Sequence, residues 1–502
     1  LENYQVPEWF RNVKFGIWAH WGPQCVEGSG DWMARSMYME GTREYEYHVK
    51  HYGHPSEVGF KDIIPLWKAE NWDPDKLVAF YKKIGAQYFF ALGNHHDNMD
   101  LWDSKYQPWN SVNMGPKKDI LAGWEKAARK YGLYFGVSLH ADHAWSWYEP
   151  SQRHDTKGPK KGIPYDGKLT KADGKGKWWE GYDPQDLYAQ NHPLSENSWD
   201  NGMIHRQWAW GNGVCVPSQE YCTNFYNRTL DVINRYNPDL LYFDVTVAPF
   251  YPVSDAGLKI AAHFYNHNMA THKGKLEAVM FGKILDENQR KALVWDVERG
   301  APNKIIDQPW QSCSCIGGWH YNTSIYEKNE YKSAAYVAKL LVDIVSKNGN
   351  LLLSVPLRAD GTFDEKEEKI LNEFGVWMNI NKEAIYDTRP WVVFGEGPIV
   401  EEDIPLNAQG FNEGSYSQAG AKEIRFTQTP KYLYATVLAW PADGKVNIKS
   451  LAADSKLYEG KIRKVELLGY GKVDFVRTAE GLSVTLPAQP LNQIAPVLRI
   501  AK

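Results

Sequence analysis

The chain has 502 residues, of which 43% are hydrophobic, so it is long enough for one large and one smaller domain or for several. Its net charge of -4 gives no electrostatic reason to bind nucleic acid or an anionic membrane. No apolar run approaches the roughly 20 residues of a membrane-spanning helix. Aromatic residues make up 14% of the chain, with 22 Trp and 30 Tyr. Because aromatic faces pack well on the C–H faces of sugars, this composition weakly favours a carbohydrate-binding protein.

The five cysteines are widely spaced: Cys25, Cys215, Cys222, Cys313 and Cys315. An odd and sparse set does not indicate a disulfide framework. The pair at 313 and 315 has too few neighbouring ligands to predict a zinc site. The chain begins Leu-Glu rather than Met, which indicates a processed or trimmed start. This start leaves the compartment open, and the expected types are secreted, periplasmic or lysosomal.

Strand-like runs alternate with helical patterns along most of the chain. The first strand is expected at 13–21 ("VKFGIWAHW"), and Asp73 and Pro74 then begin a helix that Gly85 ends. Further strands are predicted at 87–92, 133–139, 240–244, 276–280, 292–296 and 350–356, and further helices at 120–130, 225–235 and 334–349. Repeated strand–helix units of this length predict a parallel sheet, and a TIM-like (β/α) barrel is the closed form that fits best.

Two regions depart from this alternation. The region 146–213 is irregular, and we interpret it as a long insertion in one strand-to-helix loop, either functional or, in its lysine-rich part at 157–177, simply solvated. Beyond about residue 396, short strand-like runs are separated by turn residues without any helical pattern. The sequence thus predicts a catalytic barrel over 1–395 and an antiparallel β-sandwich over 396–502, with the chemistry in the barrel.

Ionisable residues stand at the end of one predicted strand after another. They are His20, His95, His96, His140, Asp142, His143, Asp244, Asp296 and Glu298. In a parallel barrel the carboxyl ends of the strands converge at one mouth, where active sites lie. Any single residue of this kind is explained by a satisfied buried histidine or by a carboxylate that caps a helix. Their recurrence predicts a functional site.

Two chemistries could use these residues. A metal-dependent hydrolase would take His20, His95, His96, His140 and Asp244 as ligands. Against it, the "AHWG" segment has no second histidine two residues on, and the adjacent imidazoles of residues 95 and 96 are expected to diverge. The alternative is glycoside cleavage by two carboxylates, Asp244 as nucleophile and Glu298 as acid, which must lie roughly 5–5.5 Å apart in a retaining enzyme. The spacing along the chain permits this geometry without establishing it.

Several long segments carry a resemblance to a known family. They are "KFGIWAHWGP" (14–23), "GNHHDNMDLWDSKYQPWNSVNMGPKKDIL" (93–121), "YNPDLLYFD" (236–244), "VERGAPNKIIDQPWQSCSCI" (297–316), "IVSKNGNLLLSVPLRADGTF" (344–363) and "EAIYDTRPW" (383–391). In this order they closely resemble glycoside hydrolase family 29, the α-L-fucosidases. The resemblance covers nearly the whole chain apart from 146–213, and the β-sandwich also fits it.

The resemblance implies a retaining double displacement without metal or other cofactor. Asp244 occupies the nucleophile position and Glu298 the acid/base position, with Asp296 in reserve because the acid/base varies between subfamilies. Residues implied or expected to hold the sugar are Trp18, His20, Asp31, Trp32, His95, His96, His140 and Tyr242. The histidines would then bond sugar hydroxyls rather than a metal, and Asp97 would order the turn that carries two of them.

Some positions depart from the family pattern. The third strand ends in Val137 to His140, where Tyr-Tyr-Ser is common, and Val245 follows the nucleophile position where glycine is usual. An expected arginine is not evident, and Lys283 is the nearest cation. L-Fucose is L-galactose without the C6 hydroxyl, so a polar residue at position 140 favours a substrate with that hydroxyl.

These observations predict an exo-acting retaining glycosidase that releases a terminal α-L-fucose, or a closely related L-sugar, from oligosaccharides. The alternatives are an α-L-galactosidase acting on glycans such as those of algae, a non-catalytic sugar-binding relative, and a metal-dependent hydrolase. We expect an oligosaccharide substrate and no nucleic-acid partner. Linkage, aglycone and oligomeric state are left open.

Overall fold

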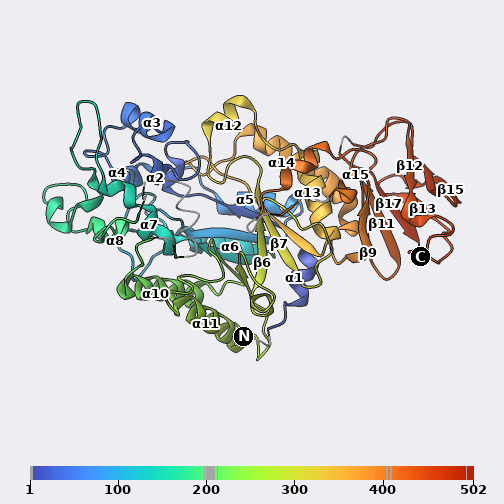
Figure 1. Cartoon of the computed structure of the whole chain (residues 1–502), viewed down its shortest axis with the longest axis horizontal. Helices are drawn as coiled ribbons and strands as arrows, with labels where there is room; N and C mark the ends of the chain where they lie inside the picture. The colour runs from blue at the N-terminus through green and yellow to red at the C-terminus, as the bar shows by residue number, and fades with distance from the viewer. Residues whose placement is uncertain are drawn as a thin grey trace.

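A computed structural model of the chain describes residues 4–196, 198, 210–211, 213–402, 405–406, 410–492 and 494–501. Eight parallel strands close into a barrel in chain order, which confirms the predicted TIM-like architecture (Figure 1). The barrel strands are β1 (Phe15–Ala19), β2 (Tyr88–Asn94), β3 (Tyr134–Leu139), β4 (Leu240–Phe243), β5 (Val279–Gly282), β6 (Val294–Glu298), β7 (Trp310–Cys315) and β8 (Gly349–Ser354).

The longer helices lie outside the barrel, and capping residues set where several of them begin. Asp73 accepts a hydrogen bond from the Lys76 amide and so caps the predicted helix α5, and Asp119 caps α6 in the same way. These helices are α1 (Glu8–Val13), α5 (Pro74–Lys83), α6 (Ile120–Lys130), α10 (Gln219–Tyr236), α11 (Ala256–Thr271), α12 (Thr323–Lys328), α13 (Ala334–Ser346) and α14 (Glu365–Asn381). Within the described ranges, none is both long and apolar enough to cross a bilayer.

Short helices form a lobe at one end of the molecule, at the left of Figure 1. They are α2 (Met33–Ser36), α3 (Arg43–His51), α4 (Phe60–Ile63), α7 (Ala144–Trp147) and α8 (Pro184–Tyr188). The last two belong to the long excursion between β3 and α10. A buried ion pair, Lys61 Nζ to Asp166 Oδ2 at 2.8 Å, ties this excursion to the segment before α5. Two loops far apart in the sequence thus make one wall beside the barrel mouth.

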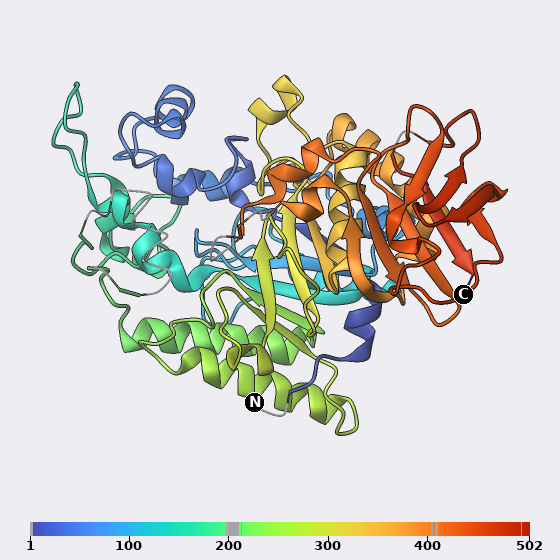
Figure 2. The ribbon, with the colours of Figure 1, turned by 45° about the vertical axis from the view of Figure 1, so that its right-hand side comes forward.

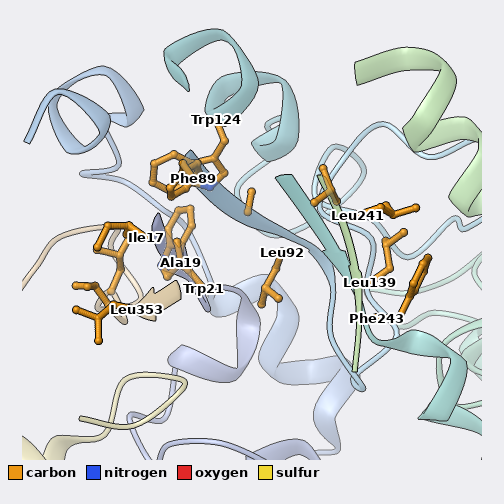
Figure 3. Close-up of a cluster of buried hydrophobic side chains, with 14 of the residues drawn as sticks. Ile17, Ala19, Trp21, Phe89, Leu92, Trp124, Leu139, Leu241, Phe243 and Leu353 are labelled. Atoms are coloured by element: carbon orange, nitrogen blue, oxygen red, sulfur yellow. The ribbon is translucent and has the colours of Figure 1, made fainter. Parts of the chain in front are cut away.

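The register of the first strands explains their continuous apolar runs. Ile17 pairs with Phe89, and Trp18 with Phe90. Side chains at the first pair point towards the outer helices, where Phe89 lies 4.9 Å from the ring of Trp124 on α6 (Figure 3). Side chains at the second pair point into the barrel. Because both faces of the strands are buried, no polar alternation appears in the sequence.

The C-terminal part is the predicted antiparallel β-sandwich, at the opposite end of the molecule from the helical lobe (Figure 2). One sheet has the order β14-β13-β17-β11-β10-β9 and the other the order β12-β16-β15, and Phe426 and Val484 belong to the core between them. The strands are β9 (Arg389–Glu396), β10 (Ile424–Gln428), β11 (Tyr432–Val437), β12 (Lys445–Ile448), β13 (Val465–Leu467), β14 (Gly471–Lys472), β15 (Asp474–Thr478), β16 (Gly481–Thr485) and β17 (Val497–Ala501).

Strand β7 was not among the predicted strands. Its sequence, "WQSCSC", is small and polar and carries no β-branched residue. It forms because it pairs in parallel with β6 and β8, and this pairing closes the barrel. The formation of this strand therefore depends on tertiary pairing and not on the local preferences of its residues.

Candidate active site

The carboxyl ends of the strands open onto one pocket with a volume of about 240 Å³. This is below the roughly 300–1,000 Å³ of most small-molecule sites, so it suits one small ring. Its lining residues are Trp18, His20, Asp31, Trp32, His95, His96, His140, Tyr242, Asp244, Lys283, Glu298, Cys313, Trp319 and Phe411. Every sugar-binding residue predicted from the sequence is in this set, together with Asp244 and Glu298. Asp296 is not.

The two carboxylates meet at one ammonium group. Lys283, at the end of β5, hydrogen-bonds through Nζ to Asp244 Oδ1 and, at 2.6 Å, to Glu298 Oε2. Its side chain is only 3% exposed. Burial alone would raise the pKa of Asp244, but the ammonium of Lys283, together with His96 and His140, holds that pKa well below its usual range. Asp244 is therefore ionised at neutral pH, as a nucleophile must be.

Asp296 lies beneath the pocket rather than in it. Its carboxylate accepts hydrogen bonds from the Tyr242 hydroxyl at 3.2 Å, the Cys313 thiol at 3.1 Å and the Gln311 amide at 2.9 Å. Burial raises its pKa to about 6, against the opposing effect of Lys283. That pKa would suit a general acid, but the side chain is 1% exposed and its acceptor sites are occupied. The geometry therefore favours Glu298 over Asp296 as the acid/base.

Imidazoles form the facing wall of the pocket. Burial, with smaller effects from neighbouring imidazoles, lowers the pKa of His20 and His95 well below the usual range, and burial also lowers that of His140. The Gln24 amide donates to Nδ1 of His95 at 2.8 Å, which leaves the proton of that ring on Nε2. These side chains are thus neutral hydrogen-bonding groups at neutral pH, suited to sugar hydroxyls.

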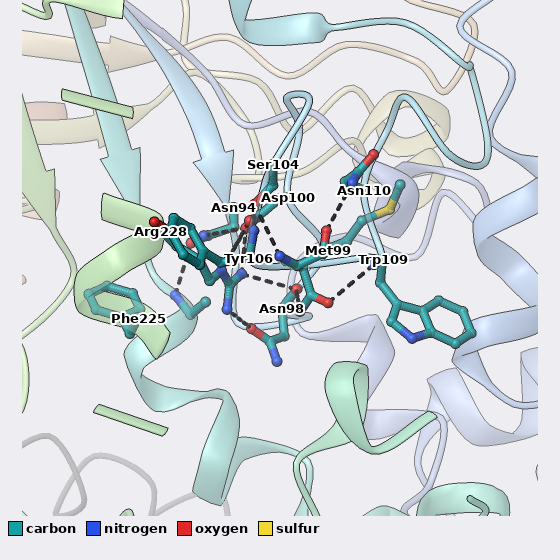
Figure 4. A network of polar contacts seen from close by, with 12 residues as sticks. Asn94, Asn98, Met99, Asp100, Ser104, Tyr106, Trp109, Asn110, Phe225 and Arg228 are labelled. Carbon is teal, nitrogen blue, oxygen red and sulfur yellow. Dashed lines mark hydrogen bonds and ion pairs between the residues drawn. The ribbon is translucent and has the colours of Figure 1, made fainter. Parts of the chain in front are cut away.

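The turn that carries His95 and His96 is fixed by a buried polar network (Figure 4). Arg228 of α10 pairs with Asp100 and donates to Asn98 Oδ1 at 2.7 Å, and Asn94 donates to Asp100 at 2.9 Å. The adjacent histidines were expected to diverge, but their ring centroids are 4.5 Å apart and both line the pocket. The expectation was wrong because β2 ends at Asn94, so the alternation of a strand no longer applies to the next two residues.

Residues after β7 complete the pocket and were not found from the sequence. His320 donates through Nδ1 to Asp31 Oδ1 at 2.6 Å, and the same carboxylate oxygen lies 3.7 Å from His95 Nε2. Trp319 lines the pocket beside it. The signal was present, since "GGWHYN" brings Trp and His just past a strand end. It was missed because β7 itself was not recognised.

The imidazoles lie close enough together to hold a metal ion. Ligand atoms of His95, His96 and His140 lie within 4.8 Å of one another, and so do those of Asp31, His95 and His320. In the first set, however, His96 Nδ1 already donates to the His140 carbonyl at 2.9 Å and His95 Nδ1 is held by Gln24. The same pocket contains three carboxylates, of which Asp244 and Glu298 share one ammonium group, and a pair of carboxyl groups at one sugar is what glycoside cleavage needs.

Comparisons with known proteins agree with this geometry. A family model described as alpha-L-fucosidase matches residues 1–383, and one described as alpha-L-fucosidase C-terminal domain matches residues 418–501. Plasma alpha-L-fucosidase of Homo sapiens is 23% identical over 98% of this chain and 88% of its own length. A structure of Thermotoga maritima alpha-fucosidase with a mechanism based inhibitor has a TM-score of 0.69 at 24% identity, covering 99% of this chain and 97% of that one. A Bacteroides thetaiotaomicron alpha-L-fucosidase, solved as a trapped covalent intermediate, has a TM-score of 0.62 at 18% identity and covers 100% of this chain and 97% of that one. The chain therefore belongs to the α-L-fucosidase family of glycoside hydrolases.

Proposed function

We propose that the chain is an exo-acting retaining glycosidase that releases terminal α-L-fucose from oligosaccharides. The observation that carries the proposal is the single ammonium of Lys283, which bonds both Asp244 and Glu298 at the mouth of a pocket lined also by imidazoles and aromatic rings. A pocket of this size, closed below by the barrel core, fits one terminal sugar.

In the first step, the ionised carboxylate of Asp244 attacks the anomeric carbon, and the bond to the leaving oxygen breaks. Glu298 gives its proton to that oxygen, so the leaving sugar departs as an alcohol. In the second step, Glu298 takes a proton from water, the hydroxide displaces Asp244 from the anomeric carbon, and L-fucose leaves. The imidazole wall holds the sugar hydroxyls throughout.

Two observations support retention of the anomeric configuration. Because both carboxylates bond to the same nitrogen, their nearest oxygens lie no more than about 6 Å apart. Inverting glycosidases need roughly 6.5–9.5 Å between the carboxyl groups to admit a water molecule, whereas retaining ones need about 5–5.5 Å. The trapped covalent intermediate of the Bacteroides relative is also what a retaining mechanism forms.

The test is the configuration of the first-formed product. Proton NMR during hydrolysis of an aryl α-L-fucoside should record α-L-fucose before mutarotation. The Asp244→Gly variant should lose turnover and regain it, with release of β-L-fucosyl azide, when azide is added, while it still binds L-fucose. Initial release of the β anomer by the wild type, or near-normal turnover by Asp244→Gly without azide, would contradict the mechanism.

A second candidate substrate is an α-L-galactoside. His140 is 2% exposed, lines the pocket and has no hydrogen-bond partner for either ring nitrogen among the described residues, although Nδ1 lies 3.9 Å from Asp244 Oδ2. A buried polar group left in this state costs roughly 1–3 kcal/mol, and a sugar hydroxyl would relieve that cost. The comparison of kcat/KM for aryl α-L-fucoside and aryl α-L-galactoside decides between the two, and faster fucoside cleavage removes the second candidate.

A further inference from the structure

A segment between the barrel and the β-sandwich folds back onto the end of β6. The Phe411 amide donates to the Glu298 carbonyl at 2.8 Å, and the Glu413 amide donates to the Arg299 carbonyl at 3.0 Å. The side chain of Asn412 accepts from the Ala301 amide at 2.9 Å and donates to the Ala301 carbonyl at 3.0 Å. Residues 410–413 are therefore held beside residues 298–301 by backbone and side-chain hydrogen bonds.

The close approach depends on glycine at the start of the segment. Gly410 pairs with Glu298 in a parallel bridge, and a Cβ at this position would lie 2.0 Å from the Glu298 carbonyl oxygen. Its φ of +133° is also one that residues with side chains rarely adopt. This contact brings the next residue to the rim of the pocket.

That residue, Phe411, is held in an unfavourable state. Its φ is +65°, a left-handed conformation that costs a residue with a side chain about 1–2 kcal/mol. Its ring is 46% exposed although it lines the pocket. Strained residues of this kind persist where the surrounding structure fixes them, and they cluster at ligand sites. An aromatic face held open at the rim is available to a ligand.

Phe411 also borders a second hollow, which we call the outer groove. It is lined by Arg299, Ile316, Gly317, Glu330, Tyr331, Lys332, Ser333, Tyr336, Phe411, Glu413 and Gly414, and its volume is about 670 Å³. The Glu413 carboxylate lies 2.9 Å from Arg299 Nε and 3.0 Å from Lys332 Nζ. With Glu330 in the same lining, the groove has two carboxylates against two cations and no net charge. With two tyrosines in its wall, this groove suits a neutral saccharide better than an anionic one.

We propose that Phe411 is the stacking platform for the leaving sugar, and that the outer groove holds the remainder of the glycan as a neutral oligosaccharide. The proposal rests on the glycosidase function proposed above. The sugar that departs must begin within hydrogen-bond distance of the Glu298 carboxyl group, because that group protonates its oxygen. Phe411 is bonded through its backbone to the same residue and presents its ring where pocket and groove meet.

The test compares two substrates that differ only in the leaving group. Fluoride is too small to reach Phe411, whereas the sugar of a fucosyl disaccharide would stack on it. Phe411→Ala should lower kcat/KM for the disaccharide by roughly 3–10-fold and leave α-L-fucosyl fluoride within about twofold of the wild type. Phe411→Tyr, which keeps an aromatic ring, should have the wild-type kcat/KM for the disaccharide. Tyr470→Ala, which removes an exposed aromatic ring from the β-sandwich, should change neither rate.

Each other outcome rejects the proposal. Equal losses on both substrates would mean that Phe411 only positions the Glu298 segment. An unchanged disaccharide rate would mean that the ring does not contact the leaving sugar. If the wild type hydrolyses the fluoride but Phe411→Ala has no selective effect on the disaccharide, the proposed role of Phe411 is wrong while the proposed function stands. If the wild type hydrolyses neither substrate, both fail.

Discussion

The two walls of the pocket are both buried, yet they differ in charge. On the side of β1 to β3 the groups are imidazoles, and burial lowers the pKa of His20, His95 and His140. On the side of β4 to β6 they are two carboxylates and one lysine, and Lys283 holds the pKa of Asp244 well below its usual range even though burial opposes it. Burial thus determines the pKa of the imidazoles, even though carboxylate oxygens lie 3.7 Å from His95 and 3.9 Å from His140. At Asp244 the hydrogen-bonded Lys283 ammonium, together with His96 and His140, reverses the effect of burial.

This difference suggests that the two walls have different functions. In the proposed function, the imidazole wall binds the sugar hydroxyl groups, while the charged wall supplies the nucleophile and the acid for the reaction. Changes to the charged wall should therefore alter turnover and its pH dependence. Changes to the imidazole wall should alter substrate binding and selectivity instead.

The largest effect is expected at Glu298. Glu298→Gln should lower kcat/KM, which reports the first step, by about 10²–10⁴-fold for oligosaccharides, whose leaving groups need a proton. The loss in kcat/KM should be much smaller for α-L-fucosyl fluoride, whose leaving group needs none. Asp296→Asn changes a carboxyl group two residues away on the same strand, beneath the pocket, and should cost less than about tenfold. Steady-state kinetics of both variants on both substrates measure the contrast. If Asp296→Asn loses more activity than Glu298→Gln, Asp296 and not Glu298 is the acid/base.

A smaller but diagnostic effect is expected at Lys283. Lys283→Met should lower kcat/KM near neutral pH by roughly 10–10²-fold. Without the ammonium, burial raises the pKa of Asp244, so the nucleophile ionises only at higher pH. The acidic limb of the pH profile of kcat/KM should therefore move to higher pH. Lys283→Arg keeps the charge and is the control, and a profile that stays in place in Lys283→Met would show that another group keeps Asp244 ionised.

On the opposite wall, His140→Phe should lower kcat/KM by about 5–50-fold without moving the pH profile. The imidazole is neutral across the working range, and its replacement breaks no hydrogen bond within the described residues. The loss should be greater for an aryl α-L-galactoside than for the fucoside if His140 contacts the C6 hydroxyl. The exposed His272→Phe is the matched control. A shifted pH profile in His140→Phe would mean that this histidine carries charge.

The smallest effect, less than twofold, is expected from metal removal. Prolonged treatment with EDTA followed by gel filtration should leave kcat/KM unchanged, because the proposed mechanism needs only Asp244 and Glu298 and no metal. Activity that disappears and returns with added zinc would instead assign the three neighbouring imidazoles at residues 95, 96 and 140 to a catalytic metal site.

Sequence patterns were sufficient for the elements with strong local signals. Apolar runs and helix caps predicted seven of the barrel strands and the helices between several of them, and polar residues just past the strand ends predicted most of the pocket. The pattern failed for β7, whose small polar residues carry no local preference. Because β7 was not predicted, His320 and Trp319, which follow its end, were not predicted either.

Other features depend on distances that no local pattern encodes. Asp296 and Glu298 are two residues apart on one strand and so point to the same side of it. Only the depth of the barrel determines that the first is buried under the pocket and the second reaches its rim. In the same way, the end of β2 at Asn94 determines that both neighbouring histidines, His95 and His96, line the pocket.

The sequence by itself determined the barrel, the β-sandwich and the residue types at the strand ends, because apolar periodicity and turn residues act over short distances. Only the tertiary structure decided that Lys283 joins the two carboxylates and that Phe411 reaches the pocket from beyond the barrel. The reason is physical: these contacts join segments from 15 to more than a hundred residues apart, so they depend on how the whole chain packs, and neither segment carries a local sign of its partner.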